Sequence, residues 1–298
     1  MNASRRLASA GALLLPLLLS GCSLLSTTRR LPVPRPPAMV QTVAPEQLVA
    51  LLNRRWAALD SLNATVDIQA TALKTKEGEA RDFTTFRGII LMRKPEMLRV
   101  YGRVPVIGTR MFDMVSDGQD VTMYIPHFNK VYKGSNTVKK KSANMVLNMR
   151  PRFFFDAVVV RGLEPDDLYT VTAETDTLVD ETKKHLFTVP EYVISIMRSK
   201  PGSKQLTPVR VITFRRDDLL PYEQDLYDSE GNLETQIAYA DYRDFGSGQY
   251  PSTVTIKRPL EEYQIVLMVE NVQENQSLTD DQFQIDNIPE GTETQHLE

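Results

Sequence analysis

The strongest constraint on the fold is a two-residue alternation of apolar and polar side chains that begins at Asn63 and recurs to residue 272. Successive side chains of a β-strand point to opposite faces, so this alternation predicts strands with one buried face. Short turns such as Ser116-Asp117-Gly118 separate the segments, and such close spacing favours antiparallel hairpins over β-α-β units. Strands are predicted near 65–70, 81–93, 97–103, 109–115, 120–125, 129–133, 168–175, 184–198, 207–216, 221–228, 233–243, 252–258 and 262–272.

An amphipathic helix is predicted before the first strand. Pro45 and Glu46 suit a first helical turn, because proline needs no amide partner there and a carboxylate complements the helix dipole. Apolar residues then recur every three or four positions and include the only tryptophan of the chain. The helix is expected to span 45–62, with an apolar stripe made of Leu48, Leu52, Trp56, Leu59 and Leu62.

A second helical stretch is predicted between the two runs of strands. Ser142 is expected to cap a short helix through Met149, and Pro151 to begin another turn that carries Phe153, Phe154 and Phe155. The preceding Lys139-Lys140-Lys141 is interpreted as a solvated loop, with contact to an anionic surface as the alternative.

These elements predict a single mainly β (α+β) domain. Apolar residues make up 42% of the 298 residues and charged residues 24%, which is ordinary for a globular protein with a core. An open sheet of this many strands tends to curl. We therefore expect a large curved antiparallel sheet with helices on its concave side.

The N-terminus has the layout of a secretory leader. Arg5 and Arg6 form a basic region, and the apolar run from Leu7 to Leu19 is shorter than the ~20 residues that span a bilayer. The run ends in Leu19-Ser20-Gly21-Cys22, which contains the only cysteine and resembles the lipobox of a bacterial lipoprotein. The resemblance implies a signal peptide over 1–21, cleavage between Gly21 and Cys22, and acylation of Cys22.

Residues 22–44 are predicted to be an acylated N-terminus followed by a linker. Four prolines make the linker extended and semi-rigid, and two or more acyl chains anchor a protein stably to a membrane. Ser23 resembles the residue that lets Gram-negative lipoproteins leave the inner membrane. We therefore expect a lipid-anchored envelope protein on the outer membrane, facing the periplasm.

The predicted domain contains a series of short motifs whose order is typical of a known superfamily. In chain order they are Pro95-Glu96-Met97-Leu98-Arg99-Val100, Ser116-Asp117-Gly118, Leu226-Tyr227-Asp228, Tyr250-Pro251-Ser252 and Leu278-Thr279-Asp280-Asp281-Gln282-Phe283. Their order resembles the LolA/LolB-like superfamily of lipoprotein carriers and outer-membrane receptors. The resemblance covers 45–291 and implies an unclosed half-barrel with a helical lid over a cavity for acyl chains. Residues 292–298 are expected to be a flexible tail.

Alternation also indicates which side chains face the interior. With Arg87, Arg99, Asp113 and Thr122 pointing outward, their apolar neighbours point inward. Methionine is concentrated between Met92 and Met149, and flexible methionines suit surfaces that accept variable apolar ligands. Two interpretations stay open, a filled core against the first helix and a ligand cavity. The candidate cavity residues are Phe86, Ile90, Met92, Leu98, Val100, Phe112, Met114, Val121, Met123, Ile125 and Trp56.

The sequence argues against catalysis, a cofactor and nucleic-acid binding. It contains no Gly-x-Ser-x-Gly, Walker or His-Glu-x-x-His motif, and its three histidines have no metal-ligand spacing. The adjacent aspartates at 166–167, 217–218 and 280–281 would point to opposite faces of a strand. A net charge of −3 is too acidic for a dedicated nucleic-acid binder.

The first functional hypothesis is therefore a monomeric, membrane-anchored protein that binds the acyl chains of lipids or lipoproteins. The alternative is an envelope scaffold or sensor that uses the same fold to bind a periplasmic protein partner without transporting anything. An apolar pocket between the sheet and the 45–62 helix would favour the first, and a tightly packed interior the second.

Overall fold

In the computed structural model the described residues are 39–74, 78–104, 108–136, 150–180, 185–199, 202, 204–246 and 248–297. They divide into two compact units, the first within residues 177–180 and 185–188 and the second within residues 39–176 and 189–297. The described part of the first unit consists of the ends of two paired strands, 177–180 and 185–188. The second unit contains all the features discussed below. The predicted signal peptide, Cys22, most of the linker, Lys139-Lys140-Lys141 and the predicted helix from Ser142 to Met149 lie outside the described residues.

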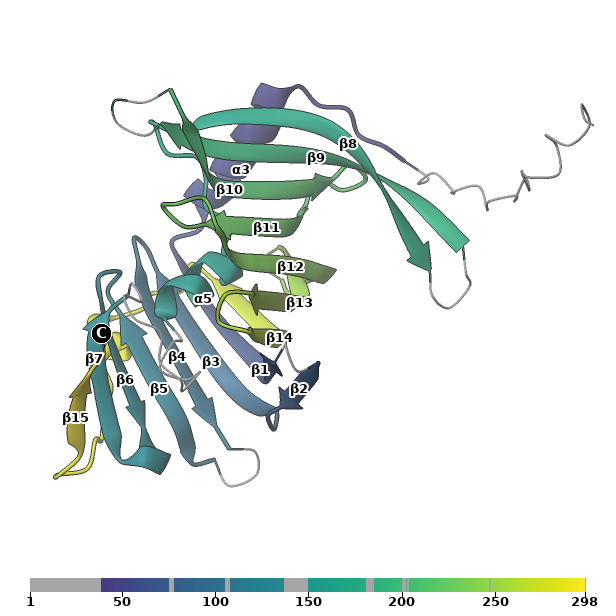
Figure 1. Cartoon of the computed structure of the whole chain (residues 1–298). Helices are drawn as coiled ribbons and strands as arrows, with labels where there is room; N and C mark the ends of the chain where they lie inside the picture. The colour runs from purple at the N-terminus through teal and green to yellow at the C-terminus, as the bar shows by residue number, and fades with distance from the viewer. Residues whose placement is uncertain are drawn as a thin grey trace, which may run out of the picture. The chain divides into compact units, whose positions relative to one another are not determined.

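The described chain forms one large unclosed sheet of 15 strands (Figure 1). The order is β15-β7-β6-β5-β4-β3-β1-β14-β13-β12-β11-β10-β9-β8, with β2 paired to β1. The strands from β1 to β7 and from β9 to β14 pair antiparallel, whereas β15 pairs in parallel with β7, so the sheet is mixed. The strands are β1 (Ser61–Lys74), β2 (Glu79–Asp82), β3 (Phe86–Arg93), β4 (Met97–Arg103), β5 (Arg110–Ser116), β6 (Asp120–Ile125), β7 (Lys130–Ser135), β8 (Leu168–Asp180), β9 (His185–Ser199), β10 (Leu206–Arg215), β11 (Pro221–Tyr227), β12 (Leu233–Asp244), β13 (Gln249–Arg258), β14 (Tyr263–Glu274) and β15 (Glu293–His296).

Two α-helices in the described part of the chain pack on the sheet. Helix α3 (Pro45–Ala58) buries Leu48 and Leu52 against Ile194 and Phe214 of β9 and β10. Helix α5 (Pro151–Val158) contacts β4, β5 and β13, and its three phenylalanines enter the largest core cluster. The turn predicted to begin at Pro151 is therefore a helix. Two short 3₁₀ helices, η2 (Pro126–Phe128) and η3 (Asp280–Phe283), complete the elements. None of the helices in the described residues is long and apolar enough to cross a membrane.

The first helix is shorter than predicted. It ends at Ala58, whereas Leu62 lies in β1 and is fully buried there. The amide of Asn275 explains the difference, because its Nδ2 donates to the carbonyl of Ala58 at 2.9 Å and its Oδ1 accepts from the backbone of Asp60 at 2.7 Å. These two bonds satisfy backbone groups at the helix end and turn the chain into the first strand.

The charged residues expected on the outer face of the sheet are not all in water. Arg87 is largely exposed, but Asp113 is fully buried and Arg99 nearly so. The C-terminal segment from Leu278 to Gly291 covers them, with Leu278 and Phe283 packed against Leu91 of β3. Arg99 and Asp113 form a bidentate ion pair beneath it, with N–O distances of 2.9 and 2.7 Å.

The C-terminus is not the flexible tail that its polarity predicted. Glu293–His296 form β15, which pairs in parallel with β7, and the amide of Leu297 donates to the carbonyl of Lys133 at 2.7 Å. The outer edge of β7 offers unpaired backbone groups, and the tail satisfies them. Backbone pairing of this kind requires no apolar pattern in the sequence.

Candidate functional site

The ten strand residues predicted to line a cavity all lie on the inner face of the sheet. Each is buried, and all belong to the one core cluster that also contains Phe153, Phe154 and Phe155 of α5. The predicted facing of these strands is thus confirmed. Their role as a ligand surface stays a prediction, since α5 packs against this face. Trp56, the eleventh candidate, is half-buried at the edge of the cluster.

A cavity of about 630 Å³ lies between α3 and strands β11–β13 of the sheet. Such a volume is typical of small-molecule pockets. Trp56 and Ala58 of α3 form one wall, and the segment Val158–Val160 after α5 forms another. Its lining residues are Leu52, Arg55, Trp56, Ala58, Leu59, Val158, Val159, Val160, Phe214, Asp218, Leu220, Pro221, Tyr239, Tyr242, Gly248, Gln249, Tyr250, Pro251 and Glu274.

Three tyrosines of β12 and β13 give the cavity an aromatic wall. The hydroxyl of Tyr250 donates to the carbonyl of Val158 at 2.5 Å, and that of Tyr242 donates to the carbonyl of Pro221. The hydroxyl of Tyr239 accepts from Nε2 of Gln224 at 3.2 Å. Burial raises the pKa of all three phenols, so they stay neutral at physiological pH. Because the hydroxyls are bonded to the protein, the rings are left as apolar surface.

The cavity is also lined by one basic side chain, Arg55, and two acidic side chains, Asp218 and Glu274. Arg55 donates from Nη1 to the carbonyl of Leu219 at 2.7 Å, and burial lowers its pKa although Tyr242 and Asp218 oppose the shift. Asp218 accepts from the hydroxyl of Tyr222 at 2.9 Å and from the amide of Leu220 at 2.8 Å. Burial and this bond to Asp218 raise the pKa of Tyr222 to about 12. The third group is Glu274.

The tryptophan is held in place by a cation. The ammonium of Lys94 lies 3.9 Å from the centre of the Trp56 ring and donates to the Trp56 carbonyl. Burial lowers the pKa of Lys94. On another side the ring meets Phe155 edge to face, with 6.4 Å between centroids. Trp56 is thus fixed between α5 and the cavity, and its fluorescence is a natural reporter of what enters.

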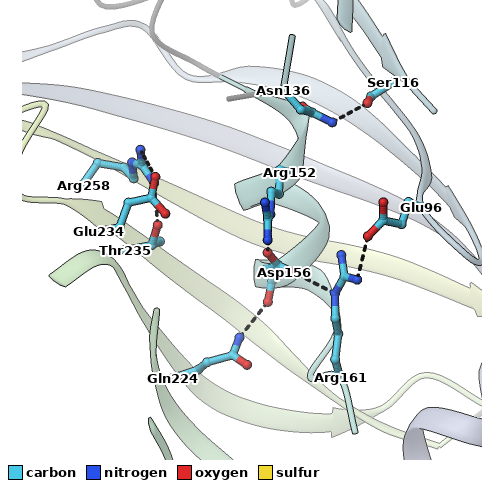
Figure 2. Close-up of polar contacts among 10 residues, drawn as sticks. All are labelled: Glu96, Ser116, Asn136, Arg152, Asp156, Arg161, Gln224, Glu234, Thr235 and Arg258. Carbon is cyan, nitrogen blue, oxygen red and sulfur yellow. Dashed lines mark hydrogen bonds and ion pairs between the residues drawn. The ribbon is translucent and has the colours of Figure 1, made fainter. Parts of the chain in front are cut away.

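Polar contacts fasten α5, which forms part of the cavity's frame (Figure 2). Asp156 of α5 binds Nε of Arg161 at 2.7 Å, and Nη1 of Arg161 binds Oε1 of Glu96 at 3.0 Å. Gln224 of β11 donates to the Asp156 carbonyl at 2.7 Å. The helix is therefore tied to loops and strands on both sides, which keeps the walls of the cavity in place.

A second cavity, of about 510 Å³, lies at the N-terminal end of α5 and has a more polar lining than the first. Arg150, Arg152 and Arg258 line it. Arg258 is paired with Glu234 at 3.3 Å and donates to the hydroxyl of Thr235 at 2.7 Å (Figure 2). Within the described residues no group of three or more His, Cys, Asp or Glu side chains could hold a metal ion.

Sequence reasoning found one wall of the 630 Å³ cavity and missed the others. The stripe of α3 pointed to Leu52, Trp56 and Leu59, which do line it. Tyr250 was part of a motif of the resemblance, but nothing in the sequence indicated that it, Tyr239, Tyr242 or Glu274 lines a cavity. The alternation of β12–β14 predicts an inner face without showing where packing is left open.

Comparisons with known proteins place this geometry in a known fold. The chain aligns with the LolA superfamily protein of Nitrosomonas europaea at a TM-score of 0.51 and 13% identity, over 82% of this chain and 99% of that one. It aligns with a DUF1329 family protein of Desulfovibrio piger at 0.51 and 16%, over 80% and 95%. A domain of Vibrio parahaemolyticus described as an outer membrane lipoprotein-sorting protein aligns at 0.50 and 13%, over 80% and 94%.

At this level of identity the alignments establish architecture. No family model matches the sequence, and no curated protein matches it. The solved structures nevertheless align over four-fifths of the chain and nearly the whole of each neighbour. The unclosed sheet with helices packed on its inner face is the LolA/LolB-like fold.

Proposed function

We propose that this protein is a membrane-anchored lipoprotein that binds acyl chains of lipids or lipoproteins in the 630 Å³ cavity. The observation that carries the proposal is an apolar cavity walled by α3 on one side and the tyrosine-bearing strands on the other. The same fold occurs in a protein described as lipoprotein-sorting. The lipobox-like Leu19-Ser20-Gly21-Cys22 supports an envelope location.

The physical chemistry of the cavity suits reversible transfer. Each methylene that enters an apolar site gains ~0.8 kcal/mol relative to water, and this gain is nearly the same in a bilayer. An acyl chain can therefore leave the protein for a membrane without an energy source. The role proposed is in lipoprotein sorting or envelope lipid handling.

Filling the cavity should weaken binding of an uncharged acyl ligand. Ala58 lines the cavity and is exposed to it, so Ala58→Phe places a ring where about two methylenes would lie. Losing two methylenes corresponds to roughly tenfold weaker binding. The measurement is titration of the Cys22→Ala chain with dodecanoyl glycerol, followed by the fluorescence of Trp56, the only tryptophan.

Ala57→Phe is the matched control, because Ala57 is the preceding exposed residue of α3 and does not line the cavity. It should bind like the unaltered chain. Mass spectrometry of the purified protein should also show co-purified lipid. Absence of any binding, or equal binding by the two phenylalanine variants, would contradict the proposal and favour the scaffold alternative.

The anchoring part of the proposal has its own test. Cys22→Ala removes the thiol that would accept the acyl group, so the protein should move from the membrane fraction to the soluble periplasmic fraction. Its melting temperature should stay within about 1 °C of the unaltered domain, because substitutions outside a core are usually within ±0.5 kcal/mol. Ser26→Ala serves as a control that keeps the membrane location. A Cys22→Ala protein that remained membrane-bound would refute acyl anchoring.

A further inference from the structure

The charges that line the 630 Å³ cavity do not balance. Its titratable groups other than the neutral tyrosines are one guanidinium, Arg55, and two carboxylates, Asp218 and Glu274. If all three are ionised, the lining carries a net charge of −1. In an apolar site such an excess acts strongly on a ligand, because the effective dielectric constant is well below that of water.

Arg55 and Asp218 already have partners in the protein. The guanidinium of Arg55 donates to the Leu219 carbonyl and has Asp218 as a nearby counter-charge. Asp218 receives a hydroxyl and a backbone amide. Asp218 lies in the connection between β10 and β11, and Arg55 reaches this connection from α3. The two groups compensate each other, so the excess negative charge does not belong to this pair.

Glu274 is different, because its side chain has neither a hydrogen bond nor an ion pair to any of the described residues. It is the last residue of β14, opposite Leu62 of β1 in register, and its side chain is half-buried. Burial raises the pKa of its carboxyl group. The hydroxyl of its neighbour Tyr250 donates to Val158 instead.

Nearby groups offer Glu274 no compensation. The C-terminal end of α3 is adjacent through the bond from Asn275 to Ala58, and a helix C-terminus carries partial negative charge. A partly desolvated carboxylate without a donor costs free energy, and a ligand that brings a donor recovers it.

We propose that the cavity selects amphiphiles whose polar end carries an ammonium group over those that end in a carboxylate, with Glu274 as the residue that discriminates. This inference rests on the proposed acyl-chain binding and specifies its ligand class. The acyl chain occupies the surface between Trp56 and the tyrosines, and the ammonium donates to the Glu274 carboxylate. A ligand carboxylate at the same place is repelled by a like charge.

The test compares three ligands that share a twelve-carbon chain: dodecylamine, dodecanoate and dodecanoyl glycerol. At pH 7 the Cys22→Ala chain should bind dodecylamine at least about tenfold more tightly than dodecanoate, the ratio that about 1.4 kcal/mol provides. In Glu274→Gln the ratio should fall to within about twofold, while affinity for dodecanoyl glycerol stays within about twofold. Glu230→Gln, in an exposed turn, makes the same charge change away from the cavity and should keep the wild-type ratio.

The outcomes separate this inference from the function it rests on. If none of the three ligands binds, the proposed function fails. If dodecanoyl glycerol binds but the amine shows no advantage, or keeps its advantage in Glu274→Gln, only the role of Glu274 is overturned.

A second comparison identifies which kind of molecule supplies the ammonium group. Lysophosphatidylethanolamine and S-dodecyl-cysteine amide are each compared with their N-acetylated, uncharged forms. The pair that loses more affinity on acetylation identifies the source, and loss by neither overturns the inference.

Discussion

Asp113→Ala is expected to lower the free energy of unfolding by about 3–5 kcal/mol, the range for removing one partner of a buried ion pair. Asp113 is fully buried, and its two oxygens accept from Nε and Nη2 of Arg99. Burial by itself lowers the pKa of Arg99, and its bonds to Asp113 outweigh this effect and raise it. Without the carboxylate, the arginine keeps its charge in a covered site and loses its bidentate partner, while the carbonyl of Gln282 at 2.9 Å and the ring of Tyr101 remain.

Urea denaturation followed by circular dichroism measures the loss. Arg87→Ala is the control, because Arg87 pairs with Glu270 on the same outer face but is 56% exposed, and such pairs contribute less than about 1 kcal/mol. The double variant Arg99→Met with Asp113→Leu should recover most of the loss, since an apolar pair avoids the desolvation cost. A loss for Asp113→Ala no greater than that for Arg87→Ala would show that the pair does not hold the covering C-terminal segment.

Local sequence signals were sufficient for most of the sheet. The predicted strands 97–103 and 120–125 match β4 and β6 at both ends. Alternation and turn residues act over a few positions, so they can be read from the chain directly. The predictions were wrong where contacts between residues far apart in the sequence determine the local structure. The end of α3 depends on Asn275, which lies 217 positions from Ala58, and the burial of Asp113 depends on the C-terminal segment.

The position of the site was harder to predict for a related physical reason. Alternation shows which side chains face inward, and it placed all ten strand candidates on the inner face. It does not show what covers them. The phenylalanines of α5 fill the space over β4 and β5, whereas the space between α3 and β11–β13 is left open beside Trp56. The volume of a cavity is decided by such packing between elements, which no single segment encodes.

Because α5 fills one part of the inner face and frames the other, Phe154→Ala should affect both stability and binding. Phe154 is 1% exposed and stacks on Phe153 with 4.5 Å between ring centroids. Truncating a buried phenylalanine costs about 3–5 kcal/mol of unfolding free energy through lost transfer energy and a residual cavity. Phe128→Ala, at a ring that is 41% exposed in η2, should change stability by no more than about 0.5 kcal/mol.

The comparison of Phe154→Ala with Asp113→Ala distinguishes a local effect from a general one. Both variants should be strongly destabilised. Only Phe154, however, belongs to the helix that leads into Val158–Val160, which line the 630 Å³ cavity. At a temperature where both variants are folded, Phe154→Ala should therefore bind dodecanoyl glycerol more weakly, while Asp113→Ala, altered on the opposite face, should bind like the unaltered chain. Equal weakening in both variants would mean that affinity follows global stability, and unchanged binding in Phe154→Ala would mean that α5 does not shape the ligand site.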